Sequence, residues 1–352
     1  MTERQLDELG FYLLGGAPTG PRTLIEEARA GEALGLGTGF ISERWNTKEP
    51  ASLSGAALAV TEEMRVAIAA TNHNTRHPLV TASWATTMHR FSNGRFTLGL
   101  GRGVTALYKA FGLPPVTTAQ MEDFAGIMRR LWRGETIIAH DGPAGKFRAL
   151  QLDSDFNEDI RLGLVAFGPD TLALGGRAFD DVILHTFFTE ETLQRCVRTV
   201  KDAAEKAGRD PEAVHVWSCL ATVGDHLPEE LRMKKTVARL ATYLQGYGDI
   251  MVKTNHWDPE VLQRFRADPL VASFTEAIDN KADAAQIARI AELIPDEWLQ
   301  PAATGTAEQC AARVRRELEL GADRVIMHGA TPEELAPIVK AYRATDTRTR
   351  KS

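Results

Sequence analysis

The sequence predicts a (β/α)8 barrel, and three observations support this prediction. Short β-rich runs recur along the 352 residues, helical patterns stand between most of them, and prolines mark the starts of several helices. The runs that we expect to be strands are residues 10–14, 38–42, 65–70, 95–99, 161–166, 181–185, 215–222 and 323–328. Eight strands that are nearly all followed by helices, in a chain of this size, favour a closed barrel.

The helices between these strands are predicted from their start signals. A proline suits the first turn of a helix because the N–H that it lacks would have no partner there. The prolines that we expect to begin helices are Pro21, Pro78, Pro169 and Pro332. The helical patterns around them present apolar faces that would pack against the sheet.

A doubly wound open sheet is the alternative architecture. It would require a glycine-rich turn after the first strand, with an acidic residue roughly 20 residues further on. The sequence Gly15-Gly16-Ala17 does not match that fingerprint, and the glycines at 35, 37 and 39 precede a strand instead of following one. The barrel is therefore the preferred prediction.

Two segments interrupt the alternation of strands and helices. Residues 133–158 contain HDGPAGKF and predict a hairpin or long loop before the fifth strand. Residues 224–303 read as helical and predict an insertion between the seventh strand and its helix. Insertions at this place commonly form lids or substrate walls, and a dimerisation or packing element is an equal alternative. We expect residues 1–352 to form a single barrel domain that carries both insertions.

Composition limits the kinds of partner. The formal net charge is −6 and no long basic run is present, which argues against nucleic acid or an anionic membrane as the main partner. The charged N-terminus lacks the apolar core of a signal peptide, and no apolar run approaches the ~20 residues of a membrane span. Three cysteines without a CxxC pair suit a reducing compartment. We therefore expect a cytoplasmic protein that acts on a small molecule.

Polar and glycine residues gather where the predicted strands end. In parallel α/β folds this edge of the sheet is where ligands bind. The second strand is followed by Ser42, Glu43, Arg44 and Trp45, and the third by Thr71, Asn72, His73 and Asn74. The fourth is followed by Gly101, Arg102 and Gly103, and the fifth by Phe167, Gly168 and Pro169. His185 and Thr186 stand at the end of the sixth strand, and His328 and Gly329 at the end of the eighth.

The ends of the fourth and fifth strands indicate a phosphate site. The Arg102 guanidinium is a fixed cationic fork, and glycine at 101 lets the backbone approach a ligand. Gly168 and Pro169 open a helix, whose free N–H groups attract anions. Together these features predict a phosphorylated cofactor. In the alternative interpretation Arg102 is an ion-pair partner and the glycines serve barrel packing.

A metal site and a serine nucleophile are weaker alternatives. His73, His185 and His328 stand at strand ends, and histidine is a common zinc ligand. The chain lacks an HxH motif on the first strand, an HExxH motif and a G-x-S-x-G motif. We therefore predict no metal, and a metal-dependent barrel hydrolase remains only a minor alternative.

Several motifs in a fixed order resemble those of a known family. They are AATNHNTRHP, GRFTLGLGRG, FISERWNTKE, AFGPDTLALGGRAFDDVIL and GTAEQCAARVRRELELGADRVIM. This combination resembles the luciferase-like monooxygenase superfamily. It is most similar to the branch that depends on the deazaflavin coenzyme F420, which includes proteins like methylenetetrahydromethanopterin reductase. The resemblance covers nearly the whole chain except residues 224–303.

The resemblance implies a cofactor site at the C-terminal mouth of a (β/α)8 barrel. It places a non-prolyl cis peptide bond against the cofactor ring, and alignment through TRHP puts that bond at Ala69–Ala70. The loop after the fourth strand and the loop after the fifth would hold the cofactor phosphate. The residues assigned to the cofactor in this way are Ala69, Ala70, Thr71, Asn72, Gly101, Arg102, Ala166, Phe167, Gly168 and Pro169.

The resemblance also implies candidates for proton transfer. Glu43 stands where relatives often have an aspartate near the ring, and the candidates in order are Glu43, His73 and His185. Trp45 would stack on the substrate, or would be a buried aromatic at the rim. The chain departs from the family in having Glu43-Arg44 in place of an aspartate–histidine pair. It also has Val104 where the deazaflavin-linked glucose-6-phosphate dehydrogenase has an acidic residue, which argues against sugar-phosphate activity.

The predicted function is that of an F420-dependent oxidoreductase, in which a hydride passes between the cofactor and a small organic substrate. One alternative is a monooxygenase that uses flavin mononucleotide (FMN), which would share the barrel and the phosphate loop. Another is a barrel protein that binds a flavin without catalysis. By analogy with the family, we expect a homodimer or a larger homo-oligomer.

Overall fold

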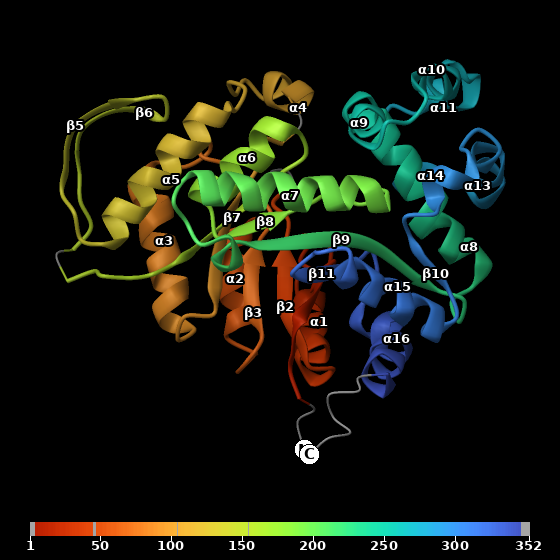
Figure 1. Cartoon of the computed structure of the whole chain (residues 1–352), viewed down its shortest axis with the longest axis horizontal. Coiled ribbons are helices and arrows are strands. Elements are labelled where there is room, and N and C mark those ends of the chain that lie inside the picture. Colours follow the sequence, from red (N-terminus) through yellow and green to blue (C-terminus); the bar gives the residue numbers. More distant parts are fainter. Residues whose placement is uncertain (1–3, 45–46, 104, 154, 346–352) are drawn as a thin grey trace. The chain divides into compact units, whose positions relative to one another are not determined.

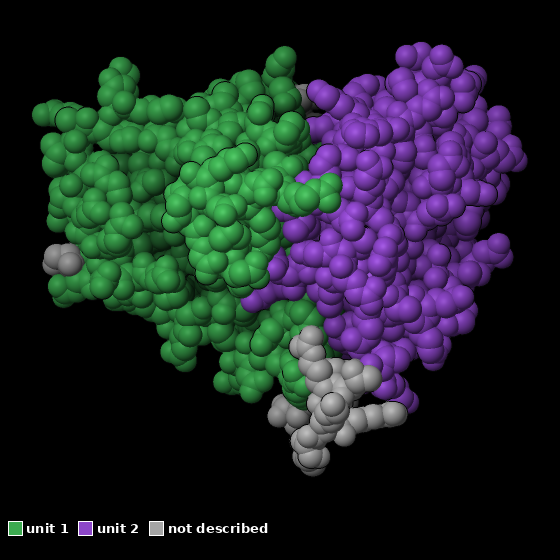
Figure 2. Space-filling view, viewed as in Figure 1, with its two compact units in different colours: residues 1–184, 198–217 green, residues 185–197, 218–352 purple. Residues whose placement is uncertain are grey.

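A computed structural model of the chain describes residues 4–44, 47–103, 105–153 and 155–345 (Figure 1). The chain divides into two compact units. Unit 1 comprises Met1–Leu184 and Arg198–Trp217, and unit 2 comprises His185–Val197 and Ser218–Ser352 (Figure 2).

Unit 1 is built on a parallel sheet. Its strands pair in the order β1-β2-β3-β4-β7-β8, and β8 also pairs with the first residues of β9. The strands of this sheet are β1 (Leu6–Tyr12), β2 (Leu36–Ile41), β3 (Arg65–Ile68), β4 (Phe96–Leu100), β7 (Arg161–Val165), β8 (Asp181–Ile183) and the start of β9 (His215–Gly224). Because all of these pairs are parallel, the strands of unit 1 end at one edge of the sheet.

Helices connect the strands of unit 1. They are α1 (Thr23–Ala33), α2 (Pro50–Leu58), α3 (Pro78–Phe91), α4 (Thr105–Ala110), α5 (Thr118–Trp132), α6 (Pro169–Ala178) and part of α7 (Glu190–Lys206). Pro78 and Pro169 are the first helical residues of α3 and α6, as predicted, whereas Pro21 lies two residues before α1. The predicted interruption before the fifth barrel strand is an antiparallel hairpin, β5 (Ile137–Gly142) and β6 (Gly145–Leu150), which extends beyond α5 in Figure 1.

Unit 2 contains the rest of β9, which pairs with β10 (Ala303–Gly305) and with β11 (Arg324–His328). Helices α15 (Ala307–Glu319) and α16 (Pro332–Ala344) also belong to it. The segment between β9 and β10 is helical, as predicted. It consists of α8 (Glu229–Met233), the π-helical turn η2 (Lys234–Ala238), α9 (Arg239–Asn255), α10 (Pro259–Ala267), α11 (Pro269–Ser273), α12 (Ile278–Lys281), α13 (Ala284–Ala291) and α14 (Asp296–Leu299).

The fold is a (β/α)8 barrel with a helical insertion, as the sequence predicts. Within the described part of the chain, strands β1, β2, β3, β4, β7, β8, β9 and β11 correspond to the eight predicted runs. The largest difference is at β1, which starts at Leu6 instead of residue 10. Asp7 is exposed and Glu8 is partly exposed between the buried Leu6 and Leu9, so the start of this strand resembles a polar terminus in sequence. The single-domain organisation stays a prediction.

A charged network anchors the starts of β7, β8 and β9 in unit 1. Asp181 is buried and accepts hydrogen bonds from Trp217 Nε1 at 2.9 Å and from Arg161 Nε at 2.8 Å. Its other partner is His215, whose Nδ1 lies 3.6 Å away. Burial alone would raise the pKa of Asp181, but the hydrogen bond with His215 and the charge of Arg161 hold that pKa well below its usual range. Because Asp181 opens β8, this network is a stabilising element at the end of the sheet opposite the site.

No helix within the described ranges has the length and apolar character needed to cross a membrane.

Candidate active site

The loops that follow β2 and β3 meet at the carboxylate of Glu43. Thr71 Oγ1 donates a hydrogen bond to Glu43 Oε2 at 2.5 Å, and Asn72 Nδ2 lies 3.4 Å from the same oxygen. The other oxygen, Oε1, lies 3.0 Å from Arg76 Nη2, and the Glu43 side chain is only 5% exposed. The structure thus brings together three residues predicted for the site: Glu43, Thr71 and Asn72.

Arg76 is a residue of this site that the sequence reading did not assign. Its guanidinium also binds Glu49 Oε1 at 2.9 Å and donates to Thr71 Oγ1 at 3.1 Å. Glu49 in turn caps α2 by accepting hydrogen bonds from the backbone N–H groups of Ala51 and Ser52. Arg76 therefore ties the loop after β3 to the loop after β2. It stands inside the TRHP motif, but no spacing in the sequence indicates that it faces Glu43.

Both oxygens of Glu43 are engaged, which limits what this carboxylate can do. A group that accepts a proton from a substrate needs an oxygen lone pair directed at that substrate. Glu43 instead accepts hydrogen bonds from Thr71, Asn72 and Arg76 at once. The geometry suits a residue that fixes the positions of these three side chains.

His73 lies next in the same loop and is placed differently. Its ring centroid is 5.8 Å from that of Phe124, and the side chain is half-buried. Within the described residues, no side-chain hydrogen bond of His73 is present. Burial lowers the pKa of His73, so the imidazole is neutral near pH 7. A neutral, partly accessible imidazole can both donate and accept a proton.

The peptide bond between Ala69 and Ala70 is cis, as the family resemblance predicts. Tyr12 Oη donates a hydrogen bond to the carbonyl oxygen of Ala69 at 3.3 Å. Ala69 is buried and Ala70 is partly exposed. The cofactor role of these two residues stays a prediction.

The glycines after β4 have a packing reason. Gly101 N donates to Thr71 O at 2.9 Å, so the ends of β3 and β4 remain paired beyond the regular strands. A Cβ on Gly101 would lie 2.9 Å from the Cβ of Ala70, and one on Gly99 would overlap the carbonyl oxygen of Ile68. Close approach of the two strands therefore requires these glycines, whatever ligand binds. Arg102 is exposed, and its Nη2 donates to Thr118 Oγ1.

The loop after β7 leaves open space at the start of α6. Ala166 is buried, whereas Phe167 and Gly168 are partly exposed. Gly168 is the N-cap of α6, and no side chain caps that helix. A Cβ on Gly168 would meet no atom within 4 Å. Uncapped N–H groups beside open space are what a bound phosphate requires, so this position fits the predicted cofactor.

His185 belongs to unit 2, in which it forms part of an aromatic cluster. Its ring packs edge-on against Tyr243 at 4.7 Å and Tyr247 at 5.6 Å, and its Nδ1 lies 3.2 Å from the carbonyl oxygen of Thr186. Burial lowers its pKa to about 4, so the imidazole is neutral. The Tyr243 hydroxyl also lies 3.4 Å from His328 Nε2.

Two predicted positions, Trp45 and Val104, lie outside the described residues. Among the described residues, no group of three or more histidine, cysteine, aspartate or glutamate side chains could hold a metal ion.

The family model described as luciferase-like monooxygenase matches residues 10–324. The chain belongs to this family. A monooxygenase family consists of oxidoreductases, so the predicted class of enzyme is confirmed at this level.

One curated relative is the 5,10-methylenetetrahydromethanopterin reductase of Methanolobus tindarius. It is 26% identical over 307 residues, which are 85% of this chain and 87% of the relative. Among solved structures, the coenzyme F420-dependent tetrahydromethanopterin reductase of Methanopyrus kandleri superposes with a TM-score of 0.77 at 18% identity, covering 96% of this chain and 98% of the other.

A third similar protein carries a different cofactor. The oxygenating component of 3,6-diketocamphane monooxygenase from Pseudomonas putida, solved in complex with FMN, superposes with a TM-score of 0.62 at 17% identity, covering 97% of this chain and 96% of the other. At these identities the structural likenesses show the shared barrel fold and do not distinguish the two cofactors.

Proposed function

We propose that this protein is a coenzyme F420-dependent oxidoreductase that transfers a hydride between the deazaflavin and a small organic substrate. The observation that carries the proposal is the start of α6 at Gly168, where no side chain caps the helix and a Cβ would meet no atom within 4 Å; the paired ends of β3 and β4 belong to the same unit. The relative from Methanolobus tindarius is named as a methylenetetrahydromethanopterin reductase, and the tetrahydromethanopterin reductase of known structure from Methanopyrus kandleri is coenzyme F420-dependent, which favours the deazaflavin over FMN.

In this proposal the ends of three strands hold the cofactor. Gly168 and the first turn of α6 bind the phosphate, and Arg102 supplies a positive charge from the loop after β4. Ala166, Phe167 and Pro169 shape the loop around the phosphate. Ala69, Ala70, Thr71 and Asn72 lie against the ring. The bound deazaflavin supplies the hydride chemistry, and the protein orients it and limits the access of water.

We assign different roles to Glu43 and His73. His73 exchanges the proton with the substrate, because its imidazole is neutral and has no hydrogen-bond partner among the described residues. Glu43 positions Thr71 and Arg76, because both of its oxygens are already engaged. His185, in unit 2, remains the third candidate for proton transfer, and its imidazole is neutral.

The experiment that tests this function measures reaction with each cofactor. Purified protein is mixed anaerobically with oxidised F420 and a panel of alcohols, and loss of the visible absorbance of the deazaflavin reports hydride transfer. In parallel, reduced FMN and oxygen are supplied with the corresponding ketones and aldehydes. Substrate-dependent reduction of F420 supports the proposal. Oxygen-dependent product with FMN alone supports the monooxygenase alternative, and binding of a cofactor without turnover supports a non-catalytic protein.

A further inference from the structure

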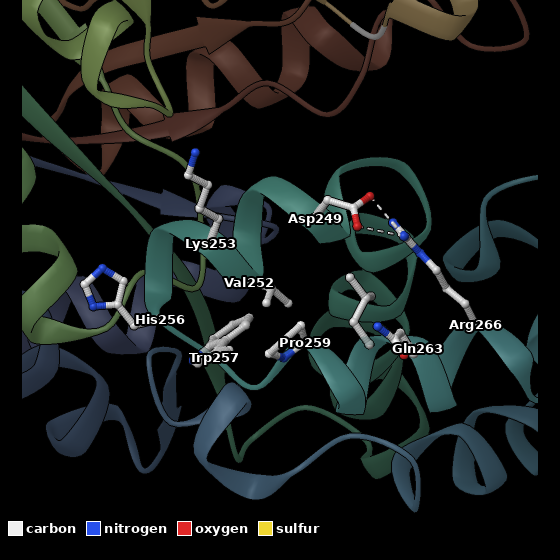
Figure 3. Close-up of a pocket in the computed structure, with 9 residues that line it drawn as sticks. Asp249, Val252, Lys253, His256, Trp257, Pro259, Gln263 and Arg266 are labelled. Atoms are coloured by element: carbon white, nitrogen blue, oxygen red, sulfur yellow. Dashed lines mark hydrogen bonds and ion pairs between the residues drawn. The ribbon is translucent and has the colours of Figure 1, made fainter.

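A cavity of about 410 Å³ lies within unit 2, between the facing sides of two insertion helices (Figure 3). Helix α9 contributes residues at the spacing i, i+3, i+4 and i+7, and α10 does the same, so each helix presents one continuous face. The residues that line the cavity are Asp249, Val252, Lys253 and His256 of α9 and its C-cap, Trp257, and Pro259, Leu262, Gln263 and Arg266 of α10. None of them was assigned to the predicted site.

The floor of this cavity is apolar and fixed in position. Val252 and Leu262 are buried lining residues, and Trp257 and Pro259 lie near Val252 in Figure 3. The Trp257 indole stacks on Trp298 with ring centroids 4.4 Å apart and planes 8° apart. Because Trp298 is buried, this stack restricts the motion of the Trp257 ring. A flat apolar group is the kind of ligand that such a floor accommodates.

The rim of the cavity carries an excess of positive charge. Asp249 and Arg266 form a two-pronged ion pair, with 3.0 Å and 2.9 Å between Arg266 Nη1 and the two carboxylate oxygens, so their charges cancel (Figure 3). The remaining charged side chain is the exposed Lys253, whose ammonium points away from Trp257 and Pro259 in Figure 3 and has no carboxylate within 4 Å among the described residues. His256 adds an imidazole, and Gln263 adds an amide that can donate hydrogen bonds.

We propose that this cavity binds a small amphipathic anion, with a flat aromatic body on the Trp257 floor and a carboxylate paired with Lys253. The volume lies within the range of about 300–1,000 Å³ that is usual for ligand sites in proteins. Because the Lys253 side chain is long and exposed, a change of rotamer can turn its ammonium over the rim to meet a carboxylate. The proposal does not depend on the cofactor or on the reaction proposed above.

The test uses the full-length chain without cofactor and two probes of the same shape, 2-naphthoate and its neutral amide, 2-naphthamide. Isothermal titration at low ionic strength gives the affinity of each probe. We expect naphthoate to bind about two- to five-fold more tightly than the amide, within the range of an exposed ion pair. In the Lys253→Met variant this preference should disappear, whereas Lys340→Met, which removes an exposed lysine of α16, should retain it.

A second variant tests the place of binding. Gln263→Trp puts a bulky ring on the α10 side of the cavity and should weaken both probes at least ten-fold, with thermal unfolding confirming that the variant is folded. The proposal is overturned if neither probe binds, if acid and amide bind equally to the wild type, or if Lys253→Met keeps the preference. It is also overturned if Gln263→Trp folds and binds both probes as the wild type does.

Discussion

Arg76 Nη2 and Glu43 Oε1 lie 3.0 Å apart, and this pair joins the loops that follow two neighbouring strands. The Glu43 side chain is nearly buried, and its ion pair with Arg76 offsets the cost of removing the carboxylate from water. The same guanidinium reaches Glu49 at the cap of α2. One arginine thus ties the loop after β3 to the loop after β2 and to the start of α2.

Removal of Arg76 should leave the buried carboxylate of Glu43 without its cation. We expect Arg76→Met to lower the free energy of unfolding by about 2–3 kcal/mol, since Thr71 and Asn72 still donate hydrogen bonds to Glu43. Urea unfolding at pH 7 measures this loss. Adding Glu43→Gln to the variant should recover part of it. Arg90→Met is the matched control, because Arg90 pairs with Glu158 but is itself half exposed, and it should cost less than about 1 kcal/mol.

Asp181 should make stability depend on pH at the acid side. Its folded-state pKa is depressed, so the stabilisation is present above the unfolded pKa of about 4 and is lost as the pH falls towards the folded value. Asp181→Asn should lower the free energy of unfolding by about 3 kcal/mol at pH 7 and flatten its decline below about pH 4. Urea unfolding over this range tests both effects. Asp141→Asn, at an exposed pair with Lys146, should leave the decline unchanged.

Two glycines should respond differently to the same small change. A Cβ at Gly168 meets open space, so Gly168→Ala should unfold like the wild type while the affinity for F420 falls at least ten-fold. A Cβ at Gly101 would press on Ala70, so Gly101→Ala should itself lower the free energy of unfolding by about 1–3 kcal/mol. Thermal unfolding and cofactor titration of both variants separate these effects. Unchanged F420 affinity in Gly168→Ala would remove the start of α6 from the phosphate site.

His73 should set the acid limb of the pH profile. Burial lowers its pKa, so kcat/KM should be constant near pH 7 and fall on acidification with a midpoint below the usual 6.5. His73→Gln should reduce kcat about 100-fold, remove this limb and leave F420 affinity within about two-fold. His77→Gln, at the exposed cap of α3, is the control and should keep the profile. An unshifted acid limb in His73→Gln would exclude His73 from proton transfer.

The sequence predicts the parts of this molecule that depend on local patterns. Strand positions follow from apolar runs, and the starts of α3 and α6 follow from Pro78 and Pro169, because burial and backbone geometry act within a few residues. The cis bond at Ala69–Ala70 follows from a motif shared with the family.

The pairing of Arg76 with Glu43 joins residues 33 positions apart and depends on how two loops fold towards each other, which no spacing encodes. The cavity beside Trp257 likewise depends on tertiary packing and not on a local sequence pattern. Its helices show ordinary amphipathic patterns, and only their packing places the two faces opposite each other.

The measurement that tests the central claim most directly is a titration of the purified protein with F420 and with FMN under identical conditions. We expect F420 to bind with one site per chain and at least 100-fold more tightly than FMN, and Arg102→Gln to weaken that binding about ten-fold. Tight binding of FMN together with no detectable binding of F420 would contradict the proposed cofactor and, with it, the proposed reaction.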